Sequence, residues 1–183
     1  MQKKVLSEID FYWGEIKMPP KFEIDRQSLK NFFIEAYLKD SRFQKKDYHH
    51  YDYKDYIANH SGENVRIKDY VRDHFNADFR KNLIQKDDWI NVYKPKESSI
   101  LRNNIDPVDL RNSPDYTFLY GVDIEKSNKV IIEFDDNRRK NRTWNYELKN
   151  NFWLMFPSTQ KYMVINNSPK QLSIIHTVTY DYI

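Results

Sequence analysis

The chain of 183 residues contains no cysteine and only three glycines. The absence of cysteine excludes disulfides, thiolate nucleophiles, cysteine-bound zinc and iron–sulfur centres. Three glycines argue against a glycine-rich phosphate loop, a collagen-like segment or a flexible linker. No run of apolar residues approaches the length of a transmembrane helix, and the basic N-terminus lacks the apolar core of a signal peptide. We therefore expect a soluble protein with no membrane partner.

Neither sign of charge dominates the sequence. The 30 basic and 27 acidic residues are interspersed and give a formal net charge of +3. This balance gives no support for a large nucleic-acid-binding surface. Aromatic residues make up 16% of the chain, so we expect an interior filled by aromatic side chains. The length suits one domain over 1–183, with a helical N-terminal part over 1–87 and a β part over 88–183.

Two amphipathic helices are predicted in the first half, after a short strand around residues 11–16 that ends at Pro19–Pro20. Asp25 is placed to cap the first helix, and the second helix follows a polar, tyrosine-rich excursion over 40–60. Apolar residues recur at helical spacing in both helices. The first face comprises Leu29, Phe32, Phe33, Ala36 and Tyr37, and the second Ile67, Tyr70, Val71, His74 and Phe75.

Short strands are predicted throughout the second half. They cover residues 89–94, 117–124, 129–134, 144–148, 152–156, 161–166 and 171–180, with Pro, Asn and Ser at the breaks. The turn-like residues 125–128 predict a β-hairpin between the second and third of these strands. Several short strands at regular spacing indicate an antiparallel sandwich or barrel, and helices packed on it give an α+β domain.

The second half also carries a series of short motifs in a recognisable order. W-x-N-x-Y at 89–93 is followed by RNNIDP at 102–107, YGVDI at 120–124, FPS at 156–158 and VINNSPKQLSII at 164–175. This order resembles the phage-type branch of the 2-oxoglutarate/Fe(II) oxygenases, the prolyl-hydroxylase-like proteins of T4-like myophages. The resemblance covers roughly residues 88–183. It implies an N-terminal strand and helices packed on a double-stranded β-helix (jelly-roll or cupin-like) sandwich.

The resemblance also implies where cofactors are held in such proteins. Iron needs two histidines and one carboxylate, and 2-oxoglutarate needs a cation for its far carboxylate. The family pattern places the metal ligands at Asn104, Asp106 and Tyr162 and the cation at Gln171. Only Asp106 has the required type, and a phenol with a pKa near 10 does not readily replace an imidazole. We therefore predict vestigial ligand positions, no bound metal and no cofactor.

Several other residues have both a functional and a simpler structural interpretation. The strongest basic cluster comprises Arg138, Arg139, Lys140 and Arg142, and it could contact a phosphate backbone. A solvated turn or a protein–protein contact is the favoured interpretation. His176 is interpreted as structural, His49–His50 as part of a solvated loop, and His74 as a core or interface residue.

The leading hypothesis is a non-catalytic jelly-roll structural or interaction protein of a tailed-phage virion, made in the host cytoplasm and placed in the neck, tail or baseplate. Its expected partners are other phage structural proteins, with several copies around a symmetry axis. This assignment comes from the resemblance alone. The alternatives are an active Fe(II)/2-oxoglutarate-dependent hydroxylase with an unrecognised ligand set and a nucleic-acid-binding module that uses the basic turn.

Overall fold

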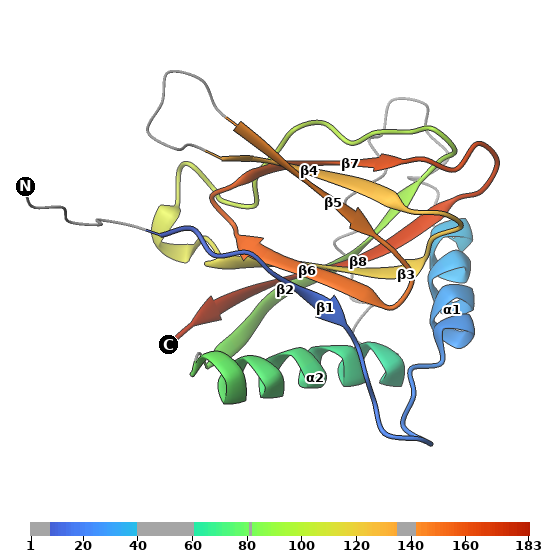
Figure 1. Ribbon diagram of the computed structural model, residues 1–183, viewed down its shortest axis with the longest axis horizontal. Helices are drawn as coiled ribbons and strands as arrows, with labels where there is room; N and C mark the ends of the chain where they lie inside the picture. Colours follow the sequence, from blue (N-terminus) through green and yellow to red (C-terminus); the bar gives the residue numbers. More distant parts are fainter. Residues whose placement is uncertain (1–7, 40–60, 81, 135–141) are drawn as a thin grey trace, which may run out of the picture.

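Two antiparallel sheets face each other, and two helices cover the outer side of the larger one (Figure 1). The computed structural model describes residues 8–39, 61–80, 82–134 and 142–183. The larger sheet has the strand order β1-β6-β3-β8-β2, and the smaller has the order β5-β4-β7. The predicted α+β jelly-roll sandwich is therefore confirmed.

The elements follow in chain order. They are β1 (Tyr12–Glu15), α1 (Arg26–Lys39), α2 (Gly62–Phe79), β2 (Leu83–Tyr93), the 3₁₀ helix η3 (Leu110–Asn112), β3 (Tyr116–Asp123), β4 (Asn128–Phe134), β5 (Arg142–Leu148), β6 (Phe152–Pro157), β7 (Lys161–Asn166) and β8 (Ser173–Tyr182). The division predicted at residue 87 falls inside β2, which has a register shift between Gln85 and Asp88. The predicted excursion at 40–60 lies outside the described residues. No helix in the described part of the chain is both long and apolar enough to cross a membrane.

Side chains of the larger sheet alternate between two apolar cores. In β8, Ile174 and Val178 pack with the helices, whereas Ile175 packs between the sheets. The expected aromatic interior is present in both cores. Its fully buried members are Tyr93, Tyr120, Tyr162, Tyr180, Phe33, Phe75, Phe118 and Phe156.

The helices form largely where their sequence patterns place them. Ser28 donates its backbone N–H to the Asp25 carboxylate at 3.0 Å, so the predicted cap of α1 is confirmed. The hydrogen bonds from Ser28 also hold the pKa of Asp25 below its ordinary value. In α2, Ile67, Val71 and Phe75 are buried as expected. The core expectation for His74 is wrong, because this position lies beside the buried stripe and its exposed ring stacks on Tyr70.

The predicted hairpin between β3 and β4 is also wrong. β3 pairs with β6 and β8 in the larger sheet, whereas β4 pairs with β5 and β7 in the smaller one. The turn at 125–128 therefore carries the chain from one sheet to the other. A turn signal reports only that the chain reverses. Which strand β3 pairs with depends on which of its faces become buried. Almost every residue of β3 is buried, because this strand lies between the helices and the smaller sheet.

Candidate functional site

A cavity of about 380 Å³ opens at one end of the sandwich, and we call it the barrel mouth. β2 and the end of β8 form one wall, and the segments 102–106 and 112–114 form the other. Trp89, Arg102, Asn104, Asp106, Ser113 and Thr179 are among the residues that line it. Two of the predicted ligand positions, Asn104 and Asp106, therefore lie at this opening.

Asn104 and Tyr162 meet at the inner side of the mouth. The Asn104 amide donates to Tyr162 Oη at 3.3 Å and to Thr117 Oγ1 at 2.9 Å. The Thr117 hydroxyl in turn shares a hydrogen bond of 2.9 Å with the Ser158 hydroxyl. Tyr162, Thr117 and Ser158 are buried. Three separate elements, β3, β7 and the segment after β6, are thus joined by a network of neutral polar groups.

The carboxylate of Asp106 has a local structural role. It accepts a hydrogen bond of 2.8 Å from the Val108 N–H, and the Asp106 N–H donates to Ser113 Oγ at 2.7 Å. These contacts close an exposed loop over residues 106–113. The hydrogen bonds of Asp106 thus lie within its own loop, and none of them joins it to Asn104 or Tyr162.

Gln171 is remote from the mouth. It is exposed and precedes β8, whereas Thr179 lies near the other end of that strand. Its backbone is fixed by the Ser168 hydroxyl and by the side-chain amide of Asn166. The structure therefore does not bring Gln171 together with the other predicted positions.

A cation beside Tyr162 is Arg102, which no sequence motif indicated. The two residues exchange backbone hydrogen bonds of 3.0 and 2.7 Å, and the Arg102 guanidinium lies 5.8 Å from the centre of the Tyr162 ring. The only sequence signal was its spacing of two residues from Asn104, which places two side chains on the same side of an extended segment.

Deeper in the barrel, the W-x-N-x-Y motif of β2 contributes Asn91. Its side-chain oxygen accepts a hydrogen bond from the Thr177 hydroxyl. The Asn91 amide nitrogen is buried and has no hydrogen-bond partner among the described residues. The interior next to the mouth is thus polar and includes one unused donor.

These donors do not fit the metal centre that the resemblance implies. The set consists of one amide, one phenol that accepts a hydrogen bond from that amide, and one carboxylate engaged in its own loop. Within the described residues, no three His, Cys, Asp or Glu side chains group together so as to hold a metal ion. A triad of two imidazoles and one carboxylate is therefore not formed by this part of the chain.

The predicted basic cluster lies mostly beyond what the structure describes. Arg138, Arg139 and Lys140 fall outside the described residues, and Arg142 is an exposed residue at the start of β5. The nucleic-acid and protein-contact interpretations of this turn both stay predictions.

Neither a protein family model nor a curated protein matches this sequence. Solved structures do match. A prolyl-4-hydroxylase from Pseudomonas putida aligns over 93% of this chain and 84% of its own, at 8% identity and a TM-score of 0.59.

Two Streptomyces proteins give similar values. AviO1 from Streptomyces viridochromogenes covers 93% and 89% of the two chains at 8% identity and a TM-score of 0.62. HygX from Streptomyces hygroscopicus, solved with nickel and 2-oxoglutarate bound, covers 93% and 82% at 6% identity and a TM-score of 0.62. Such low identities show the fold alone: this chain has the double-stranded β-helix fold of the 2-oxoglutarate/Fe(II) oxygenases.

Proposed function

We propose that this protein is a non-catalytic member of that fold and that its barrel mouth binds a protein partner without a metal. One observation carries the proposal. The Asn104 amide joins the hydroxyls of Thr117 and Tyr162 where the resemblance places two iron ligands. Neutral donors that satisfy one another are suited to fixing the shape of a surface, and they are poor ligands for Fe(II).

The rim of the mouth supports a protein as the partner. Val108 is 92% exposed and Leu110 is 64% exposed, both on the loop that Asp106 closes. A second cavity of about 370 Å³ adjoins the mouth and shares Ser113 and Pro114 with it. Exposed apolar side chains beside polar pockets are typical of protein-binding surfaces.

The finer proposal is a structural protein of a tailed-phage particle, present in several copies among other structural proteins. It rests on the motif order that resembles phage-type members of this fold. Mass spectrometry of purified phage particles tests it. We expect the protein at a fixed stoichiometry in the neck, tail or baseplate. Its absence from particles, with abundant protein in the infected cell, would contradict a virion role.

Metal binding gives the direct test of the non-catalytic proposal. Anaerobic calorimetry with Fe(II) and 2-oxoglutarate is expected to show no stoichiometric binding to the purified protein. Micromolar binding of both would overturn the proposal.

Rim variants test the binding surface. V108D and L110D are expected to weaken incorporation into particles or capture of the partner, since each places a charge at an apolar contact. L38D on α1 is the matched control, because Leu38 is 66% exposed and α1 covers the outer side of the larger sheet and contributes no residue to the mouth. Equal incorporation of all three variants would show that the partner does not bind at the mouth.

A second candidate is an active Fe(II)/2-oxoglutarate-dependent hydroxylase. It is supported by the likeness in fold to a prolyl-4-hydroxylase and by the unused Asn91 donor, which a small molecule in the barrel would satisfy. The expected sign of this activity is succinate release when the protein, Fe(II) and 2-oxoglutarate are incubated with phage or host lysate.

A further inference from the structure

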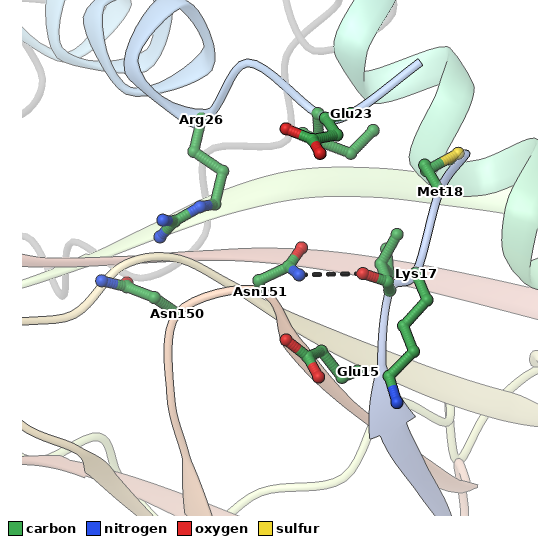
Figure 2. Close-up of a pocket in the computed structure, with 9 residues that line it drawn as sticks. Glu15, Lys17, Met18, Glu23, Arg26, Asn150 and Asn151 are labelled. Carbon is green, nitrogen blue, oxygen red and sulfur yellow. Dashed lines mark hydrogen bonds between the residues drawn. The ribbon is translucent and has the colours of Figure 1, made fainter. Parts of the chain in front are cut away.

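A third cavity, of about 480 Å³, lies at the other end of β6 from the barrel mouth. Asn151 directly precedes β6 and lines this cavity, whereas Ser158 follows the strand and belongs to the mouth network. A strand of this length separates the two places by roughly 20 Å. The polar residues that line the cavity are Glu15, Lys17, Glu23, Arg26, Asn150 and Asn151, and Figure 2 shows their side chains. We call it the charged cavity.

The floor of the charged cavity is fixed by hydrogen bonds from Asn151. Its backbone is left-handed, with φ of 66°, and its N–H donates to Gly121 O at 2.9 Å. The side-chain amide donates to Ile16 O at 2.8 Å and accepts from Tyr120 Oη at 3.0 Å. The backbone N–H and both polar atoms of the Asn151 side chain are therefore hydrogen-bonded within the protein. These bonds hold the end of β1 against the turn before β6.

Asn150 is held differently and keeps one group available. Its side-chain oxygen accepts a hydrogen bond of 2.6 Å from the Ile124 N–H, which fixes the orientation of the amide. The nitrogen of that amide has no hydrogen-bond partner among the described residues. In the view of Figure 2, Asn150 and Arg26 stand at the left of the cavity, and the carboxylates of Glu23 and Glu15 lie above and below Asn151.

The charged groups of this cavity are not used within the protein. In the described part of the chain, Glu15, Glu23 and the Arg26 guanidinium form no ion pair or side-chain hydrogen bond. Several charged residues elsewhere on the two helices are paired. Lys30 lies 2.8 Å from Asp123, Arg66 lies 3.2 Å from Glu63, and Arg72 lies 3.0 Å from Asp69. Three charges that have no partner among the described residues thus line one cavity and carry both signs.

We propose that the charged cavity binds a zwitterion, namely a free amino acid or a dipeptide with both termini free. A carboxylate would accept from the Arg26 guanidinium and the Asn150 amide, and an ammonium would donate to Glu15 and Glu23. Such charge-assisted hydrogen bonds are about twice as strong as neutral ones. A simple anion leaves both carboxylates unpaired, and a simple cation leaves Arg26 unpaired, so a ligand with both charges fits best. This site is independent of the function proposed for the barrel mouth.

Alanylalanine and its blocked forms test the proposal. In calorimetry with the full chain, we expect saturable binding of the zwitterion with a Kd below about 1 mM, and binding at least about tenfold weaker for N-acetyl-alanylalanine and for alanylalanine amide. L-Alanine distinguishes the source of the zwitterion, because tighter binding than alanylalanine indicates a free amino acid and weaker binding indicates a dipeptide. Absence of saturable binding by both zwitterions, or equal affinity for the blocked forms, overturns the proposal.

Single substitutions test which residues bind the carboxylate and which bind the ammonium of the ligand. R26Q is expected to lower the affinity for alanylalanine about tenfold and to remove its advantage over the amide. E23Q is expected to lower it similarly and to remove the advantage over the N-acetyl form. K39Q is the matched control, since Lys39 is an exposed charge on the same helix outside the cavity. Unchanged affinity in R26Q and E23Q, with thermal melts like that of the parent, overturns the site.

Discussion

At the scale of single residues, burial changes the pKa of His176 and makes the stability of the fold depend on pH. It is fully buried beneath the helices, its ring centre lies 6.1 Å from that of Phe33, and its Nε2 lies 3.9 Å from a carboxylate oxygen of Asp88. Burial lowers the pKa of His176 from 6.5 to about 4, against the opposing effect of Asp88. The interpretation of this residue as structural agrees with its position, which is on the helix side of the sheet.

This lowered pKa predicts a pH-dependent stability. Between pH 6.5 and 4 the unfolded chain binds the His176 proton and the folded protein does not. The stabilisation is therefore complete above pH 6.5 and is lost as the pH falls. The difference between a pKa of 6.5 in the unfolded chain and about 4 in the folded protein corresponds to a loss of about 3 kcal/mol by pH 4. Urea unfolding of the parent and H176Q measures it, with the exposed His74→Gln as control. Equal slopes against pH for the parent and H176Q would contradict the assignment.

Gly121 in β3 permits a close backbone approach. A Cβ atom at this position would lie 2.1 Å from the carbonyl oxygen of Lys149, which is a backbone atom and cannot rotate away. We expect Gly121→Ala to destabilise the fold by about 3 kcal/mol, since overpacking forces the strand and the turn before β6 apart. At Gly62, a Cβ atom meets nothing within 4 Å, so Gly62→Ala is the control and is expected to stay within about 1 kcal/mol. Thermal unfolding distinguishes the two.

At the scale of elements, α2 is fixed to β2 by a buried ion pair. Lys68 Nζ lies 2.9 Å from Asp88 Oδ2, and the two side chains are only 11% and 2% exposed. K68M leaves the carboxylate buried with fewer donors, so we expect a loss of about 3 kcal/mol, and K68M/D88N is expected to regain part of it. The exposed Arg72 on the same helix is the control, and R72M should cost less than about 1 kcal/mol. A loss in K68M no larger than in R72M would show that the pair does not fix α2.

The elements also show which features the sequence could predict. The cap at Asp25 and the apolar spacing of α2 depend on residues within one or two turns, and both are found as expected. Strand segments were likewise predictable from alternation. The pairing of β3 with β6 and β8 was not, because it depends on which faces become buried when distant strands meet. Local signals therefore determine elements better than they determine partners.

At the scale of the whole molecule, motif order indicated the jelly roll, and the family pattern placed ligands at Asn104 and Tyr162, which the fold brings into contact. The position of Arg102 beside Tyr162 and the existence of the charged cavity could not be predicted from the sequence. Asn150 lies more than a hundred residues along the chain from Glu15 and Arg26. None of the three belongs to a periodic pattern or a motif. Such sites appear only when the tertiary arrangement brings isolated residues together.

The contact between positions 104 and 162 makes this end of the barrel a scaffold on which a metal site can be engineered. Because the Asn104 amide lies 3.3 Å from Tyr162 Oη, imidazoles at both positions are placed to share one metal ion. We expect N104H/Y162H to bind Ni²⁺ at least about tenfold more tightly than either single variant, since Ni²⁺ favours imidazole ligands. Calorimetry measures the affinities, and the single variants serve as controls. A double variant that folds but gains no affinity would mean that this end of the barrel does not correspond to the metal position of the fold.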